Sequence, residues 1–132
     1  MANTIKLTSV NKSSVAVCLE DFTTPGNNTP GQSETFGAAI EAADGKSFFI
    51  INNENGSADI NVSLSMGDFV GAANTEAVSV AKGKMAVLFA DSAYCKTAEG
   101  MLNIKLTPPA SVSLADSGVK LAAVQFLPVV NH

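Results

Sequence analysis

Apolar residues alternate with polar ones at a spacing of two along the whole chain. The clearest runs are Ile5 and Leu7, Val15 to Leu19, Ile60 to Leu64, Val78 and Val80, Leu102 to Leu106, and Val119 to Phe126. This is the periodicity of β-strands, in which successive side chains point to opposite faces. Short stretches rich in Gly, Pro, Asn and Asp separate the runs. The pattern predicts an all-β fold, a single antiparallel β-sandwich of Ig-like or jelly-roll-like type with about 8–9 short strands.

The chain has 132 residues, which is enough for one domain that buries a core without disulfides or metals. We therefore expect a single domain over residues 1–132. Within it, residues 23–33 (TTPGNNTPGQS) are rich in Pro, Gly and Asn and lack apolar anchors. They are predicted to form a long mobile loop. The loop-rich segment 1–33 is accordingly a candidate for docking to a partner.

Residues 33–43 (SETFGAAIEAA) fit two structures. Their apolar residues fall at helical spacing behind Ser33, a candidate N-cap, but they also alternate as in a strand. Gly37 weakens a helix, and Asp44-Gly45 before an apolar run is a typical two-residue hairpin turn. A strand is favoured, and the helix remains the alternative.

The stretch at residues 47–67, SFFIINNENGSADINVSLSMG, combines three patterns. FFII is apolar on both faces, so this strand is either central and covered on both sides or presents one face to a partner. NNENGS supplies a Gly and several Asn for a tight reversal. ADINVSLS then alternates, with one apolar and one polar face. We predict a hairpin with one apolar face that is shielded from water and one polar face that is exposed to it.

Charge disfavours two classes of partner. The eight positive charges are all Lys, and twelve carboxylates give a net charge of −4. Recognition of phosphate groups uses clustered Arg and Lys, so neither nucleic acid nor an anionic membrane is an expected partner. The N-terminus has no apolar signal-peptide core, and no run approaches the ~18 apolar residues of a membrane span.

Groups for catalysis are few. The only His is His132, the last residue, and the acidic residues are scattered, with Glu20-Asp21 the one adjacent pair. No GxGxxG, GxxxxGK[ST], HExxH or GxSxG motif occurs. Cys18 and Cys95 lie in apolar alternating segments and are predicted to be free buried thiols, with a disulfide between them as the alternative. We predict no catalytic residue, no cofactor and no enzymatic activity.

Calcium is the one metal for which the sequence offers candidate ligands. The loop NNENGSAD offers oxygen ligands from Asn52 to Asp59. Its spacing does not match the D-x-[DN]-x-[DN]-G pattern, and a turn needs the same residues. A turn is favoured, and no metal-binding residue is predicted.

Residues 46–128 resemble the head decoration (cement) proteins of tailed phages, of the β-sandwich type. The similarity lies in the order of strands and turn glycines. It begins with DGKSFFIINN and INVSLSMG, continues with AVSVAKGKMAVLFA and YCKTAEGMLNIKLT, and closes on VKLAAVQFLPV. This chain has Lys46 where the family pattern tolerates Arg, and its first ~35 residues match no pattern that we associate with the family.

The resemblance implies a noncatalytic structural protein that binds the assembled capsid surface and stabilises it, as a monomer or small oligomer. Its partner would be the major capsid protein of a phage head. Its location would be the virion surface, after synthesis in the cytoplasm of a bacterial host. The alternative from the binding class is an accessory β-sandwich domain of a phage tail or baseplate that contacts a receptor.

Overall fold

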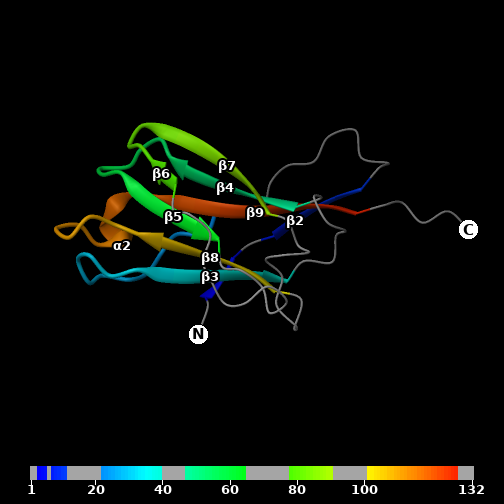
Figure 1. Ribbon diagram of the computed structural model, residues 1–132, viewed down its shortest axis with the longest axis horizontal. Coiled ribbons are helices and arrows are strands. Elements are labelled where there is room, and N and C mark those ends of the chain that lie inside the picture. Colours follow the sequence, from blue (N-terminus) through cyan, green and yellow to red (C-terminus); the bar gives the residue numbers. More distant parts are fainter. Residues whose placement is uncertain are drawn as a thin grey trace, which may run out of the picture.

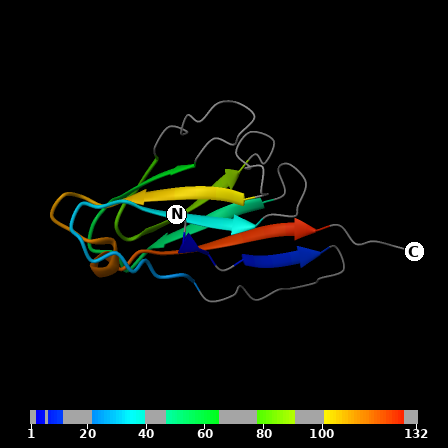
Figure 2. The same ribbon diagram turned by 90° about the horizontal axis from the view of Figure 1, so that it is seen from below.

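The computed structural model describes residues 3–5, 7–11, 22–39, 47–64, 78–90 and 101–127. The strands in these ranges form two sheets that pack face to face (Figure 1, Figure 2). Sheet A has the order β1-β3-β8-β5-β6, and sheet B has the order β2-β9-β4-β7. The strands are β1 (Asn3–Thr4), β2 (Leu7–Asn11), β3 (Glu34–Ala39), β4 (Ser47–Asn53), β5 (Ile60–Leu64), β6 (Val78–Val80), β7 (Lys84–Ala90), β8 (Met101–Thr107) and β9 (Lys120–Leu127).

The predicted all-β sandwich is confirmed. The pairs β3–β8, β4–β7, β4–β9, β5–β6 and β5–β8 are antiparallel, as expected. Two pairs are parallel, β1 with β3 and β2 with β9. The described part of residues 33–43 is a strand, β3, so the favoured interpretation holds for Glu34–Ala39. Residues 40–46 lie outside the described ranges.

The predicted hairpin over residues 47–67 is wrong. β4 pairs with β7 and β9 in sheet B, whereas β5 pairs with β6 and β8 in sheet A. The turn after β4 therefore carries the chain from one sheet to the other across the core. Alternation of apolar and polar residues shows which face of a strand points into the core. It does not show whether two strands pair in one sheet or face each other across the core, because both arrangements give the same pattern. The hairpin suggested by Asp44-Gly45 fails in the same way, because β3 and β4 also lie in different sheets.

The core lies between the sheets. β4 contributes Phe49 and Ile51, and the other sheet contributes Phe36 and Ile104, all of them buried. The remaining buried apolar side chains of this cluster are Ile5, Ala38, Ile60, Val62, Leu64, Val80, Leu102, Leu106, Leu114, Val119, Leu121 and Ala123. Period-two alternation thus identified the described inward-facing residues of β5, β8 and β9 correctly, whereas Val78 on β6 is 50% exposed. The predicted run from Val15 to Leu19 lies outside the described residues.

Residues 23–33, predicted to form a long mobile loop without apolar anchors, are hydrogen-bonded to the body of the sandwich through their backbone. Thr23 exchanges two backbone hydrogen bonds with Leu121, of 2.7 and 3.0 Å. Farther along, the Asn27 carbonyl accepts a bond from the Ala115 amide, and the Gly31 amide donates to the Val112 carbonyl. Backbone groups supply these anchors, so a search for apolar side chains could not find them.

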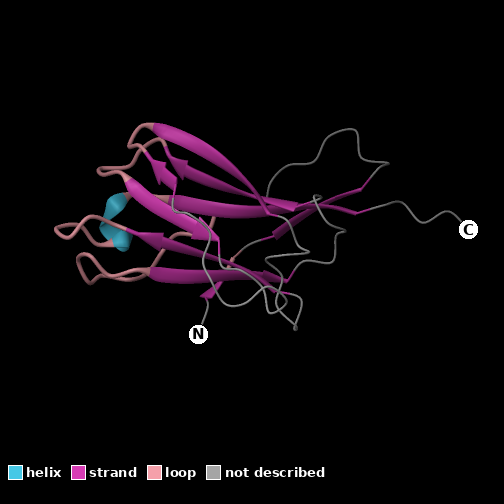
Figure 3. Cartoon of the chain, in the orientation of Figure 1, coloured by secondary structure: helices cyan, strands magenta, loops and turns pink. Residues whose placement is uncertain are grey.

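The one helix in the described ranges is α2 (Leu114–Ser117), which lies with the sheet-changing turns at one end of the sandwich (Figure 3). Ser113 caps the helix by accepting a bond from the Asp116 amide, and Gly118 ends it in the left-handed conformation, with φ of 84°. Ser-x-x-Asp followed by Gly was the signal that could have revealed it. None of the described helices is long or apolar enough to span a membrane.

Candidate protein-binding face

The structure describes only some of the residues that were considered for catalysis or metal binding. His132, Cys18, Cys95 and the pair Glu20-Asp21 lie outside the described residues. Across the ranges that the structure does describe, no three His, Cys, Asp or Glu side chains gather in a group that could hold a metal ion.

The loop considered for calcium forms the predicted turn. Asn52 Oδ1 accepts a bond of 3.1 Å from the Glu54 amide, which is an Asx turn. The side chain of Asn53 is fully buried, and its Nδ2 donates to the carbonyls of Ala58 and Val80. Asp59 Oδ1 accepts a bond from the Lys82 amide. These oxygens and amides shape the backbone at this end of the sandwich.

β4 resolves the question raised by FFII. Phe49 and Ile51 face the core and are buried, while Phe48 and Ile50 point to the outer side of sheet B and are half-buried. The strand is central in its sheet but has one face that is not fully covered. Of the two alternatives, the structure favours the one in which this face is available to a partner.

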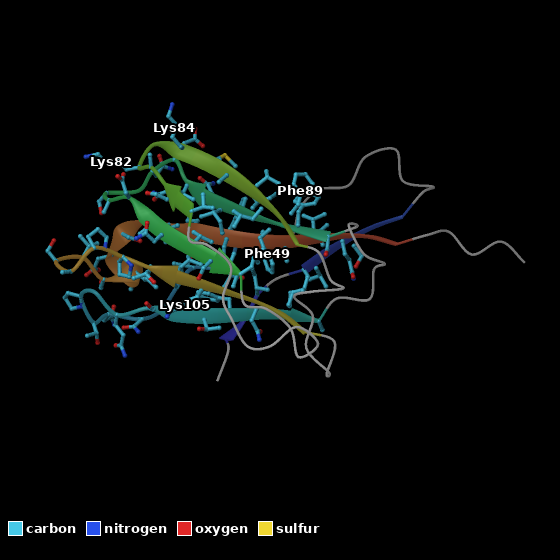
Figure 4. All side chains as sticks on the ribbon, in the orientation of Figure 1. Phe49, Lys82, Lys84, Phe89 and Lys105 are labelled. Carbon is cyan, nitrogen blue, oxygen red and sulfur yellow. The ribbon has the colours of Figure 1, made fainter. Side chains whose placement is uncertain are left out.

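β7 extends that apolar surface to the edge of the sheet. Its outward side chains are Met85, Val87 and Phe89, which are 52%, 52% and 74% exposed. They stand beside the outward residues of β4, because Phe89 pairs with Phe48 and Val87 with Ile50. The rings of Phe48 and Phe89 are 5.8 Å apart between centroids and tilted by 51°. Figure 4 shows Phe49 between the two sheets and Phe89 on the other side of sheet B.

We call this surface the β4–β7 face and define it by Phe48, Ile50, Met85, Val87 and Phe89. On the neighbouring strand β9, Ala122 and Val124 have the same outward alternation but are buried. Among the described residues on the outer side of sheet B, the exposed or half-buried large apolar side chains therefore lie on β4 and β7. They form a compact patch at the margin of sheet B.

The outer side of sheet A has the opposite character. Its central strands carry Asn61 and Ser63 on β5, and Asn103, Lys105 and Thr107 on β8. Thr35 on β3 and Ser79 on β6 continue the polar surface. A soluble sandwich usually covers its outer faces with such residues. The difference between the two outer faces sets the β4–β7 face apart.

Charge is also unevenly distributed around the face. Its five residues are uncharged, and the described lysines nearest to it in the sheet are Lys84, opposite Asn53, and Lys120, opposite Asn52. Figure 4 shows Lys84 at the end of the sandwich that holds α2. Isolated exposed apolar residues are ordinary, but contiguous ones with a polar rim are typical of protein-binding sites. The arrangement suits contact with another protein through apolar area.

Sequence reasoning found half of this face. It identified FFII as apolar on both sides but passed over β7, which reads Met-Ala-Val-Leu-Phe-Ala after Lys84. The same signal, an apolar strand with no polar face, was present there. It was missed because the segment was considered only as one of the strands in the resemblance to decoration proteins.

Comparison with known proteins finds no matching family model, no matching curated protein and no matching solved structure. The resemblance to phage decoration proteins therefore stays a prediction.

Proposed function

We propose that this chain is a structural phage-head decoration protein that binds the assembled capsid surface and stabilises it. The single observation that carries the proposal is the β4–β7 face, where Met85, Val87 and Phe89 are at least half exposed beside Phe48 and Ile50. Aromatic residues and Met are enriched at protein interfaces, and charged residues are depleted at their centres. The order of strands that resembles decoration proteins supplies the nature of the partner.

In this proposal the β4–β7 face rests on the major capsid protein, and the polar outer side of sheet A is turned to solvent. The contact gains free energy mainly from burial of apolar area, at roughly 25 cal/mol per Å². The rigid sandwich then connects neighbouring capsid subunits and opposes their separation.

The described residues of segment 1–33, the candidate for docking, are also part of the sandwich. β1 pairs with β3, β2 pairs with β9, and residues 23–31 are bonded to α2 and its flanks. Removing this segment would remove strands of both sheets. The binding test is therefore better made with side-chain substitutions on the β4–β7 face.

The test is to add the purified full chain to phage heads that lack a decoration protein and to isolated tails, and to image both. Regular added density over the head lattice is the expected result. Density on tails or baseplates only would favour the accessory-domain alternative, and no binding to either would overturn the proposal.

A further inference from the structure

β7 differs from the other edge strands of the described sheets. The edges of sheet A are β1 and β6, which have only two and three residues. At the other edge of sheet B, β2 carries the polar residues Thr8, Ser9 and Asn11. β7 has seven residues, and from Met85 to Ala90 none is charged or proline. Natural proteins usually shield sheet edges with short strands, charges, prolines or bulges.

Nor does a bulge shield β7. It pairs with β4 residue for residue from Lys84↔Asn53 to Ala90↔Ser47, so the strand is regular along its whole length. Among the described strands, none pairs with its other edge, and Figure 1 shows β7 at the margin of the molecule. A long, regular and apolar edge is a template for another strand.

Side chains on both faces of this edge can contribute to such pairing. Leu88 and Ala86 face the core but are only partly buried. On β6, the edge strand of sheet A that precedes β7 in the chain, Val78 is 50% exposed although its pairing partner Val62 is fully buried. Together with the outward side chains of β7, these residues make the margin of the sandwich apolar all round the strand.

We infer that the β7 edge pairs with β7 of a second copy of this chain, antiparallel and centred on Val87. In this register Val87 lies opposite Val87 of the second copy, and Met85 lies opposite Phe89. The outer surface then has a continuous apolar row, Ile50 and Val87 of one copy followed by Val87 and Ile50 of the other. Such cross-strand apolar pairs stabilise sheets.

The charge pattern of β7 suits antiparallel pairing with a second copy. Lys84 is the one charged residue of β7, and antiparallel pairing places it opposite Ala90 of the second copy, so the two lysines lie at opposite ends. A parallel pairing in register would set Lys84 against Lys84, which is destabilising. A two-fold pairing also uses the edges of both copies, so it closes and leaves no β7 edge for further growth.

The first test measures the mass of the full chain in solution by analytical ultracentrifugation over a range of concentrations. We expect a reversible dimer with twice the 13.5 kDa mass of the chain. Val87→Lys places two like charges opposite each other and should raise the dimer dissociation constant about tenfold or more. Ile50→Lys lies on the same face but one strand away from the edge, so it should leave the dimer intact.

A monomer at every concentration would overturn the inference, as would a dimer that Val87→Lys does not weaken. Growth into large assemblies would overturn the closed two-fold arrangement. Binding to heads separates this inference from the proposed function, because Ile50→Lys should weaken that binding while the dimer persists.

A cross-link tests the register independently of dimer affinity. Directly opposite residues of an antiparallel pair have Cα atoms roughly 4.5–5.5 Å apart, within the range of a disulfide. In a background carrying Cys18→Ser and Cys95→Ser, Val87→Cys should form a covalent dimer on mild oxidation. Met85→Cys is the matched control, because its two copies would be about 13 Å apart along the strand. Equal cross-linking of both variants would contradict the Val87-centred register.

Discussion

The side chain of Asn53, at the end of β4 in sheet B, donates a 3.0 Å hydrogen bond to the carbonyl of Val80, at the end of β6 in sheet A. The same Nδ2 donates 2.9 Å to the carbonyl of Ala58, in the turn that leads to β5. The Asn53 carbonyl accepts bonds from the amides of Gly56 and Gly83, of 3.0 and 2.8 Å. One fully buried residue thus joins both sheets at the end where the chain changes sheet.

Asn53→Ala should lower the free energy of unfolding by about 2–4 kcal/mol, because it leaves two carbonyls without their donor inside the protein. Urea denaturation followed by circular dichroism measures the loss. Asn55→Ala is the control in the same turn, since Asn55 is exposed. The interpretation fails if the two variants unfold at the same urea concentration.

Gly56→Ala should cost about 1–3 kcal/mol of stability, because a Cβ at this position would overlap Asn53 Oδ1 and force the buried amide to move. Gly26→Ala is the matched control, since a Cβ there meets nothing within 4 Å. Thermal unfolding of both variants checks the prediction. A Gly56→Ala protein as stable as the control would show that the turn does not depend on this close approach.

Ser113→Ala should reduce stability by about 1 kcal/mol, through loss of the helix N-cap. Ser113 Oγ accepts the Asp116 amide at 3.2 Å, and Ser113 is buried, whereas the nearby Ser111 is exposed. Ser111→Ala should therefore leave stability within about 0.5 kcal/mol of the original. Equal unfolding midpoints for the two variants would argue against a role for the cap.

The limits of sequence prediction follow from what alternation encodes. It placed Ile60, Val62, Ile104 and Leu121 in the core correctly, because inward positions of a sandwich recur at every second residue. It could not assign strands to sheets, because two strands facing one core look alike whether they pair or pack. The connection from β4 to β5 depends instead on bonds such as that from Asn53 to Val80, between residues far apart in the sequence.

The binding face was harder to predict than the core. Phe48 and Phe89 lie 41 positions apart and meet only because β4 and β7 are neighbours in sheet B. A run such as FFII indicates a second apolar face of the strand, but its composition does not determine whether the fold buries that face. The exposure of Phe89 answers that question, and only the arrangement of strands determines it.

Salt should have little effect on binding to heads. The β4–β7 face contains no charged side chain, and surface ion pairs around an interface contribute only about 0–1 kcal/mol each. Raising the salt concentration to about 0.5 M should change the dissociation constant less than about threefold. Cosedimentation with heads at low and high salt measures this. A loss of affinity of about a hundredfold would point to a contact built on ion pairs instead.

The most direct measurement compares the affinity of face variants for heads that lack a decoration protein. Phe89→Ser and Met85→Ser replace exposed side chains, so both should fold with nearly the original stability. Asn61→Ala, on the polar outer side of sheet A, is the matched control. If the β4–β7 face binds the shell, Phe89→Ser should weaken binding at least about tenfold, while Asn61→Ala leaves it unchanged. Equal binding by all three variants, or stronger impairment by Asn61→Ala than by Phe89→Ser, would contradict the account.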